Sequence, residues 1–211
     1  MRRKNPNRRK VTTGASGSLF RGELRIVGGE WRGRKIRFPP VGAIRPTPDR
    51  VRETLFNWLQ PVICDSRCLD LYAGSGALGL EALSRGAREV VFVDLEPQVA
   101  AHLSDRLREL RCDRGTVVRA EAGRFLAGSA GSFDVVFLDP PFADDTLAET
   151  CRRLEEGGWL SPDARIYLES PASAGAPELP TDWTLLRSKR AGEVGYHLAG
   201  RGLAHRQANR G

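Results

Sequence analysis

The sequence has few of the residues that metal sites and disulfides require. Its 211 residues include four cysteines and three histidines, and these show neither paired C-x-x-C spacings nor a matching set of histidines. We therefore expect no bound metal, and we interpret the cysteines as structural thiols in a reducing cytosol. The chain also lacks an apolar run near the ~20 residues that cross a bilayer, and no apolar segment follows its charged N-terminus. These absences argue against a zinc module, a disulfide-stapled domain and a membrane protein, and they predict a soluble, cytoplasmic protein.

Positive charge is plentiful but unevenly placed. Residues 1–52 contain 15 Lys or Arg against 3 Asp or Glu, whereas residues 53–211 contain 18 against 23. The first segment therefore carries a net charge of +12 and the second −5, so a polyanionic partner would meet the N-terminal end first. Basic tails also occur merely as solubility aids, and that alternative stays open for residues 1–10.

Strand-like apolar runs alternate with helical patterns through most of the chain. We predict strands over 67–72, 89–94, 116–120, 133–139 and 164–170, and helices over 77–85, 97–110, 122–127 and 145–156. This alternation predicts an α/β fold with a doubly wound, mostly parallel sheet. A final antiparallel hairpin over 183–188 and 194–198 would close one edge and bring the sheet to seven strands.

The chain divides into four predicted parts. Residues 1–22 have too few apolar side chains to order themselves and are predicted to be a disordered basic arm. We predict a small extension over residues 23–60, a main domain over residues 61–200 that would carry any catalytic site, and a flexible tail over residues 201–211.

The extension is predicted to be a β-hairpin followed by a helix. The hairpin strands cover 24–27 and 35–38, on either side of a glycine-rich turn. Thr47 is a suitable N-cap for the helix, and Pro48 suits its first position.

The most informative motif is Asp139-Pro140-Pro141-Phe142, which follows the apolar run 133–138. Two prolines fix φ at about −65° and remove two N–H donors, so the turn offers a carboxylate and carbonyl oxygens without competing donors. Such acceptors suit a flat ring with an exocyclic amine. Asp139 and a main-chain carbonyl can accept both amine hydrogens, while Phe142 can stack on the ring. Taken alone, the motif fits an ordinary turn equally well.

A glycine-rich loop follows the strand-like run 67–70 and contains the pattern G-x-G-x-x-G over residues 74–79. The pattern also fits a dinucleotide site or a tight turn. Asp70, however, would stand near the pyrophosphate of a dinucleotide, and two like charges at that range repel by ~1–4 kcal/mol. The sulfonium and ammonium of S-adenosylmethionine reverse that sign, and its carboxylate could meet free N–H groups at the helix start.

Four carboxylates fall at or just past predicted strand ends, namely Asp70, Asp94, Glu121 and Asp139. In doubly wound sheets, ligands bind beyond the carboxyl ends of the strands. Asp94 is placed to accept both hydroxyls of a ribose, with Glu96 as the alternative. The convergence predicts one site for cofactor and substrate at this edge of the sheet.

Together these motifs resemble the RsmD family, bacterial enzymes that methylate guanine N2 in 16S ribosomal RNA. The resemblance is carried by the segments 24–35 and 45–59 as well as by the motifs above, and it spans about Leu24 to Ala199. It implies a class I methyltransferase with a Rossmann-like fold that uses S-adenosylmethionine and releases S-adenosylhomocysteine. The implied partner is ribosomal RNA, free or within an assembling small subunit.

The resemblance and the motifs assign residues to three roles. The catalytic set is Asp139, Pro140, Pro141 and Phe142. The cofactor set is Asp70, Tyr72, Ala73, Gly74, Ser75, Gly76, Asp94, Leu95, Glu121, Ala122 and Asp139. The RNA-binding set is Arg32, Arg34, Lys35, Arg37, Arg45 and Arg50.

Several alternatives stay open. The same turn could hold the N6 amine of adenine in DNA or RNA, and a non-catalytic ribosome-assembly factor could keep the fold. Glu121 stands where the family usually has Asp, so a contact with the adenine amine competes with a surface role. Thr47 matches a family position near the cofactor, but capping alone would explain it. Trp31 could stack on a base or pack in the core. We expect a monomer, since nothing in the sequence demands more.

Overall fold

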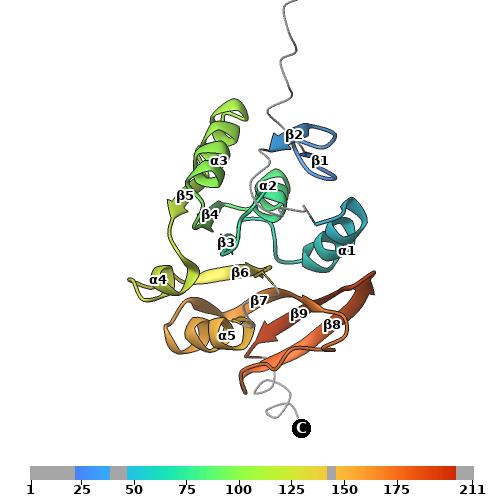
Figure 1. Ribbon diagram of the computed structural model, residues 1–211, viewed down its shortest axis with the longest axis vertical. Helices are drawn as coiled ribbons and strands as arrows, with labels where there is room; N and C mark the ends of the chain where they lie inside the picture. Colours follow the sequence, from blue (N-terminus) through green and yellow to red (C-terminus); the bar gives the residue numbers. More distant parts are fainter. Residues whose placement is uncertain (1–21, 39–46, 142–145, 203–211) are drawn as a thin grey trace, which may run out of the picture.

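The computed structural model describes residues 22–38, 47–141 and 146–202 (Figure 1). Its elements are, in chain order, β1 (Gly22–Arg25), β2 (Lys35–Phe38), α1 (Asp49–Leu59), β3 (Arg67–Asp70), α2 (Ala77–Ser84), β4 (Glu89–Asp94), α3 (Pro97–Glu109), β5 (Gly115–Arg119), α4 (Ala122–Leu126), β6 (Phe133–Leu138), α5 (Leu147–Glu156), β7 (Leu160–Pro171), β8 (Trp183–Ala191) and β9 (Val194–Arg201). β1 and β2 form a small antiparallel sheet of their own.

The main sheet has seven strands in the order β5-β4-β3-β6-β7-β9-β8. The first five run parallel to one another, whereas β9 runs antiparallel to both β7 and β8. The predicted doubly wound, mostly parallel, seven-stranded sheet is therefore confirmed, as is its antiparallel C-terminal hairpin.

Helices cover both faces of this sheet (Figure 1). On one face, α1, α2, α3 and the β1-β2 hairpin share a core that includes Phe56, Leu80 and Leu103. On the other face, α4 and α5 pack with Leu126 and Leu154 in a second core. Because the inner strands are buried on both sides, they consist of nearly continuous apolar residues.

The β1-β2 hairpin is joined to the C-terminal end of α2. The backbone N–H of Glu30 donates to the carbonyl of Ser84 at 2.7 Å, and that of Trp31 donates to the Ser84 hydroxyl at 2.9 Å. Gly29 has a φ of +76°, and a Cβ there would lie 1.8 Å from the Ser84 carbonyl oxygen, so the contact requires glycine. Trp31 is only 4% exposed and packs in the core. The core alternative for Trp31 is confirmed, and the indole is not available to a base.

Most element boundaries differ from the prediction by one to four residues, and two of the differences have a visible cause. Pro48 rather than Thr47 is the N-cap of α1, because the Thr47 hydroxyl donates to Glu169 Oε1 at 3.4 Å instead of accepting a helix N–H. β7 begins at Leu160, before the predicted start at residue 164, because Leu160 pairs with Phe133 of β6.

All four cysteines are free thiols. Within the described residues, no helix combines the length and apolarity needed to cross a membrane.

Candidate active site

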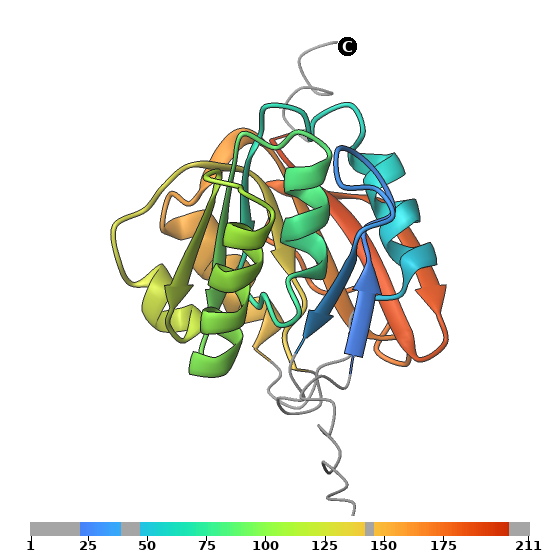
Figure 2. The same cartoon turned by 90° about the horizontal axis from the view of Figure 1, so that it is seen from above.

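A cleft of about 1740 Å³ opens at the carboxyl ends of the parallel strands. Figure 2 shows the parallel strands running the same way, so that the loops after them share one edge of the molecule. Ten of the predicted cofactor residues line the cleft: Asp70, Tyr72, Ala73, Gly74, Ser75, Asp94, Leu95, Glu121, Ala122 and Asp139. The eleventh, Gly76, does not line the cleft. It is the N-cap of α2, and its φ of +76° lets the loop turn into the helix.

Five carboxylates stand at the ends of the five parallel strands. The sequence predicted four of them, Asp70, Asp94, Glu121 and Asp139, which follow β3, β4, β5 and β6 or end them. The fifth is Glu169 near the end of β7. The five carboxylates differ in the hydrogen bonds that they accept from the protein, and so in how many acceptor positions stay open to a ligand.

Asp94 organises the glycine-rich loop. Its Oδ2 accepts from the backbone N–H of Gly74 at 2.8 Å, and its Oδ1 accepts from that of Glu96 at 2.9 Å. Each carboxylate oxygen has a second lone pair, so both can still accept a hydroxyl. Asp94 is thus fixed in an orientation that suits two neighbouring hydroxyls. Glu96, the alternative, is exposed at the N-cap of α3.

Asp70 is a buried carboxylate, only 3% exposed, whose Oδ2 accepts from the backbone N–H of Gly79 at 2.9 Å. Burial, assisted by the negative charge of Asp94, raises the pKa of Asp70 to about 7, although the Gly79 hydrogen bond acts in the opposite direction. No cationic side chain pairs with Asp70 among the described residues. The pKa of Asp70 in the folded protein lies above its unfolded value of about 4, so ionisation of Asp70 opposes folding. The free energy of unfolding should therefore fall as the pH rises from about 4 to about 7.

Glu121 caps a helix. Its Oε1 accepts from the backbone N–H of Gly123 at 2.8 Å and its Oε2 from that of Arg124 at 2.7 Å, at the N-terminus of α4. Both oxygens are therefore engaged by backbone, although the residue also lines the cleft. This cap was not predictable from the sequence, since glutamate is not among the residues preferred at an N-cap.

The carboxylate of Asp139, unlike that of Glu121, accepts no hydrogen bond from any side chain or backbone group of the described residues. Asp139 lies directly after β6 in the cleft. Burial raises the pKa of Asp139 well above its usual value, and the charges of Glu169 and Asp70 add to this effect. The carboxylate is thus held in the cleft with its acceptor positions open to a ligand. Pro140 and Pro141 also line the cleft.

Glu169 was missed by the sequence analysis. It is 6% exposed, lines the cleft, and accepts from the Tyr167 hydroxyl at 2.7 Å and from Thr47. Burial raises the pKa of Glu169, whereas its bonds from Tyr167 and Thr47 lower it. Thr47 also lines the cleft, and its contact with a cofactor stays a prediction.

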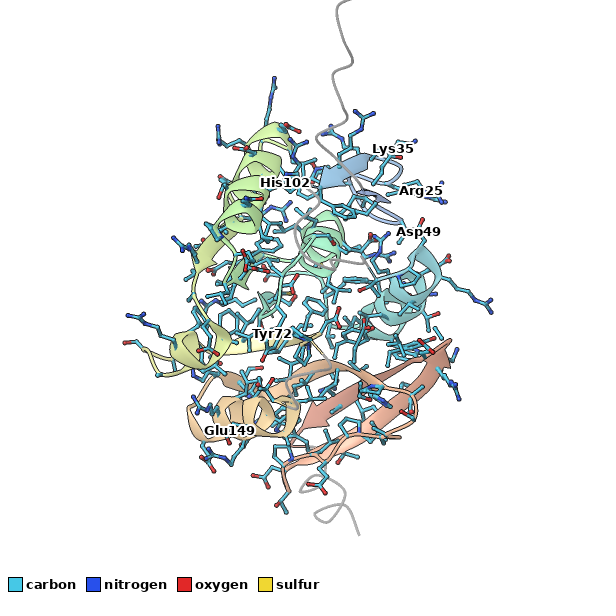
Figure 3. The ribbon with its side chains drawn as sticks, viewed as in Figure 1. Arg25, Lys35, Asp49, Tyr72, His102 and Glu149 are labelled. Carbon is cyan, nitrogen blue, oxygen red and sulfur yellow. The ribbon has the colours of Figure 1, made fainter. Side chains whose placement is uncertain are left out.

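Two more of the predicted cofactor residues, Leu95 and Tyr72, line the cleft with an exposed side chain and a hydrogen-bonded one, respectively. Leu95 is 58% exposed at the cleft and offers an apolar surface to a ring. Tyr72 lies in the middle of the molecule in Figure 3, and its hydroxyl shares a 3.0 Å hydrogen bond with Thr150 Oγ1 of α5. Phe142 and Arg45 lie outside the described residues.

The predicted RNA-binding cations occupy a separate surface. Arg32, Arg34, Lys35 and Arg37 are exposed on the β1-β2 hairpin, and Arg50 is exposed in the first turn of α1. Figure 3 shows Lys35 and Arg25 on the outer side of the molecule. Lys35 pairs with Glu23 at 2.8 Å, and Arg37 lies 3.7 Å from the same carboxylate. Within residues 22–38, 47–141 and 146–202, no group of three or more His, Cys, Asp or Glu could hold a metal ion.

Comparison with known proteins points to one group of relatives. The family model described as conserved hypothetical protein 95 matches residues 24–200. The chain is similar to ribosomal RNA small subunit methyltransferase D of Escherichia coli K12, with 49% identity over 84% of this chain and 89% of that protein. It is also similar to the Haemophilus influenzae protein of the same name, with 45% identity over 84% of this chain and 94% of that protein. The solved structure of yhhF from Escherichia coli has a TM-score of 0.80 and 47% identity, covering 85% of this chain and 98% of that one.

Proposed function

Since this chain belongs to the ribosomal RNA small subunit methyltransferase D (RsmD) family, we propose that it transfers a methyl group from S-adenosylmethionine to the exocyclic N2 of a guanine in small-subunit ribosomal RNA. The predicted family resemblance is confirmed. The geometry of the cleft supports the choice of cofactor and of an aromatic amine, whereas the choice of guanine follows from the family resemblance. Such a substrate would place the enzyme in the cytoplasm.

The cofactor proposal is supported by the charges in the cleft. Asp70 is buried without a cationic partner among the described residues, and Asp94 presents two oriented oxygens beside the glycine-rich loop. A ligand with positive charge beside Asp70 and two hydroxyls beside Asp94 would match both groups. When bound, S-adenosylmethionine supplies an electrophilic methyl group on a sulfonium.

The single observation that carries the reaction is the open carboxylate of Asp139 in front of Pro140 and Pro141. Asp139 and the carbonyl of Pro140 can accept the two hydrogens of an aromatic amine, which returns electron density to its nitrogen and holds that nitrogen in line with the methyl carbon. S-adenosylhomocysteine would leave as the methyl group is transferred, and the methylated amine would be strongly acidic. Its proton then leaves to Asp139, whose raised pKa suits this task, or to water.

The decisive experiment is mass spectrometry of small-subunit RNA from cells that lack this gene. We expect one N2-methylguanine to be missing and to return when the purified protein and labelled S-adenosylmethionine are added. Label on adenine in separated DNA or RNA pools would instead support the adenine-N6 alternative. Failure to bind S-adenosylmethionine in calorimetry, with and without RNA, would support a non-catalytic assembly factor.

The charge of Asp70 predicts how cofactor binding depends on pH. Because burial raises the pKa of Asp70 to about 7, a cationic cofactor must bind with loss of a proton at lower pH. We expect the affinity for S-adenosylmethionine to rise roughly 10-fold or more between about pH 5.5 and about pH 7.5. Calorimetry across this range would measure it, and Asp70→Asn should bind more weakly with a flatter profile. An unchanged slope in that variant would show that another group titrates.

We expect the cations of the β1-β2 hairpin to contribute to RNA binding and not to cofactor binding. Changing Arg32, Arg34 and Lys35 together to glutamine should weaken RNA binding at least ~10-fold at low salt and lower the salt slope by about 2, because each phosphate contact releases counterions. The affinity for S-adenosylmethionine should not change. Both constants can be measured by filter binding and calorimetry.

A matched control removes three exposed cations elsewhere, Arg88, Arg108 and Arg111. This variant should bind RNA within ~3-fold of the unmodified protein. If the hairpin variant lost cofactor binding, the hairpin would have been assigned the wrong role.

A further inference from the structure

Asp139 and Glu169 lie close together where β6 ends beside β7. Leu138, the last residue of β6, is paired in register with Leu168 of β7. Asp139 directly follows Leu138 and Glu169 directly follows Leu168, so the two carboxylates leave neighbouring positions, across a strand spacing of about 4.8 Å. Two positions earlier, Phe137 and Tyr167 both enter the core beneath α1 and α2, with ring centroids 6.5 Å apart. Because side chains alternate along a strand, Asp139 and Glu169 leave the sheet on that same face.

Glu169 is held by one of its two oxygens. The Tyr167 hydroxyl and the Thr47 hydroxyl both donate to Oε1, at 2.7 Å and 3.4 Å. Within the described part of the chain, no group donates to Oε2, and no cation pairs with Glu169. One oxygen is therefore anchored, while the other remains available in the cleft beside Asp139.

A buried carboxylate next to a partly buried one, with no cation to pair either, is unfavourable in a folded protein. A purely structural acceptor for Tyr167 would not need a second charge next to Asp139, because a neutral amide oxygen accepts a hydroxyl equally well. The arrangement instead suits a ligand with two donors side by side.

The Watson–Crick edge of guanine has such a pair of donors, the N1–H next to the N2 amine. Adenine has an amine next to an N1 that only accepts, so a carboxylate there would face a lone pair. On the basis of the proposed function, we infer that Glu169 accepts the guanine N1–H while Asp139 accepts an N2 hydrogen, so that Glu169 makes the site specific for guanine over adenine. Tyr167 and Thr47 position Glu169 through Oε1.

The test uses two small-subunit RNAs that differ at one base. The methylated guanine is first mapped with the unmodified enzyme, and 2-aminopurine is then placed at that position by splinted ligation. 2-Aminopurine keeps the N2 amine but lacks N1–H and O6. We expect the unmodified enzyme to prefer guanine by at least ~100-fold in kcat/KM, because a site built to accept a substrate N–H strongly disfavours an analogue without it.

The discriminating variant is Glu169→Gln, whose amide can donate to the N1 lone pair. Its preference for guanine should fall to less than ~10-fold, whereas Glu193→Gln, at the exposed rim of the same cleft, should keep the full preference. Comparing preferences between enzymes cancels the effect of the missing O6. Affinity for S-adenosylmethionine should be unchanged in Glu169→Gln.

Three results would overturn the inference: an unmodified enzyme that uses 2-aminopurine as well as guanine, a Glu169→Gln variant with an unchanged preference, or a Glu169→Gln variant with lost cofactor affinity. The first needs no variant, so the inference stays testable if Glu169→Gln does not fold. If instead the unmodified enzyme forms no N2-methylguanine at all, the proposed function itself fails, which is a separate outcome.

Discussion

Replacing Asp139 by alanine is expected to lower methyl transfer by at least ~1000-fold while the protein remains folded. The loss follows because the carboxylate is the group that would orient the amine and that is open to accept its proton, and such contributions reach about 10²–10⁴-fold. Stability should be equal or higher at neutral pH. Burial and the neighbouring charges of Glu169 and Asp70 raise the pKa of Asp139, so its ionised form opposes folding. Single-turnover assays and thermal melting measure the two quantities.

A matched control is Asp105→Ala, which removes an exposed aspartate of α3 that pairs with Arg108 and does not line the cleft. It should keep full activity. If Asp139→Ala retained more than about a tenth of the turnover, the amine would be oriented by other groups and the proposed chemistry would be wrong. An intact fold in the alanine variant is required for the comparison, and circular dichroism establishes it.

The strands were predictable because burial on both faces forces apolar runs. This holds for β4, where Val90, Val91, Phe92 and Val93 are all buried. The start of β7 was not predictable, since Pro162 and Asp163 suggest a turn. Both are exposed, and strand pairing with Phe133 extends β7 past them. Tertiary pairing thus overrode a local signal.

The site was predictable to the extent that a carboxylate ended a recognisable strand. Asp70, Asp94 and Asp139 were found by that rule. Glu169 also stands at a strand end, but the strand that ends there is β6: its last residue, Leu138, pairs with Leu168 of β7. It was missed because β7 continues to Pro171 through its pairing with β9, so Glu169 lies inside a strand in the sequence. Only the register shows that β6 ends beside it.

Arg52 illustrates what no sequence pattern could reveal. Among so many arginines it looks like another surface cation, yet its side chain is fully buried. Its guanidinium donates to Glu81 Oε2 at 3.1 Å, to Asp49 Oδ1 at 2.6 Å and to the carbonyls of Arg25 and Thr47. These bonds join β1, α1 and α2 in one buried network, which also holds Thr47 at the cleft.

Replacing Arg52 by methionine is therefore expected to lower the free energy of unfolding by about 3 kcal/mol or more, because it leaves the buried carboxylate of Glu81 with fewer donors. Glu81 keeps its bonds from Arg85 and from the backbone N–H of Val27, at 2.8 and 2.9 Å, which limits the loss. The melting temperature should fall by roughly 6–12 °C. Urea unfolding followed by circular dichroism measures the free energy.

The control and a rescue separate lost charge pairing from general damage. Arg108→Met, at a side chain that is 78% exposed, should change stability by less than about 0.5 kcal/mol. Adding Glu81→Leu to Arg52→Met should recover part of the loss, because removing both buried charges avoids leaving one unpaired. The double variant would still lack the anchor for Thr47, so its stability should recover further than its activity. A loss of less than about 1 kcal/mol in Arg52→Met would show that the network does not hold the hairpin and α1 to the core.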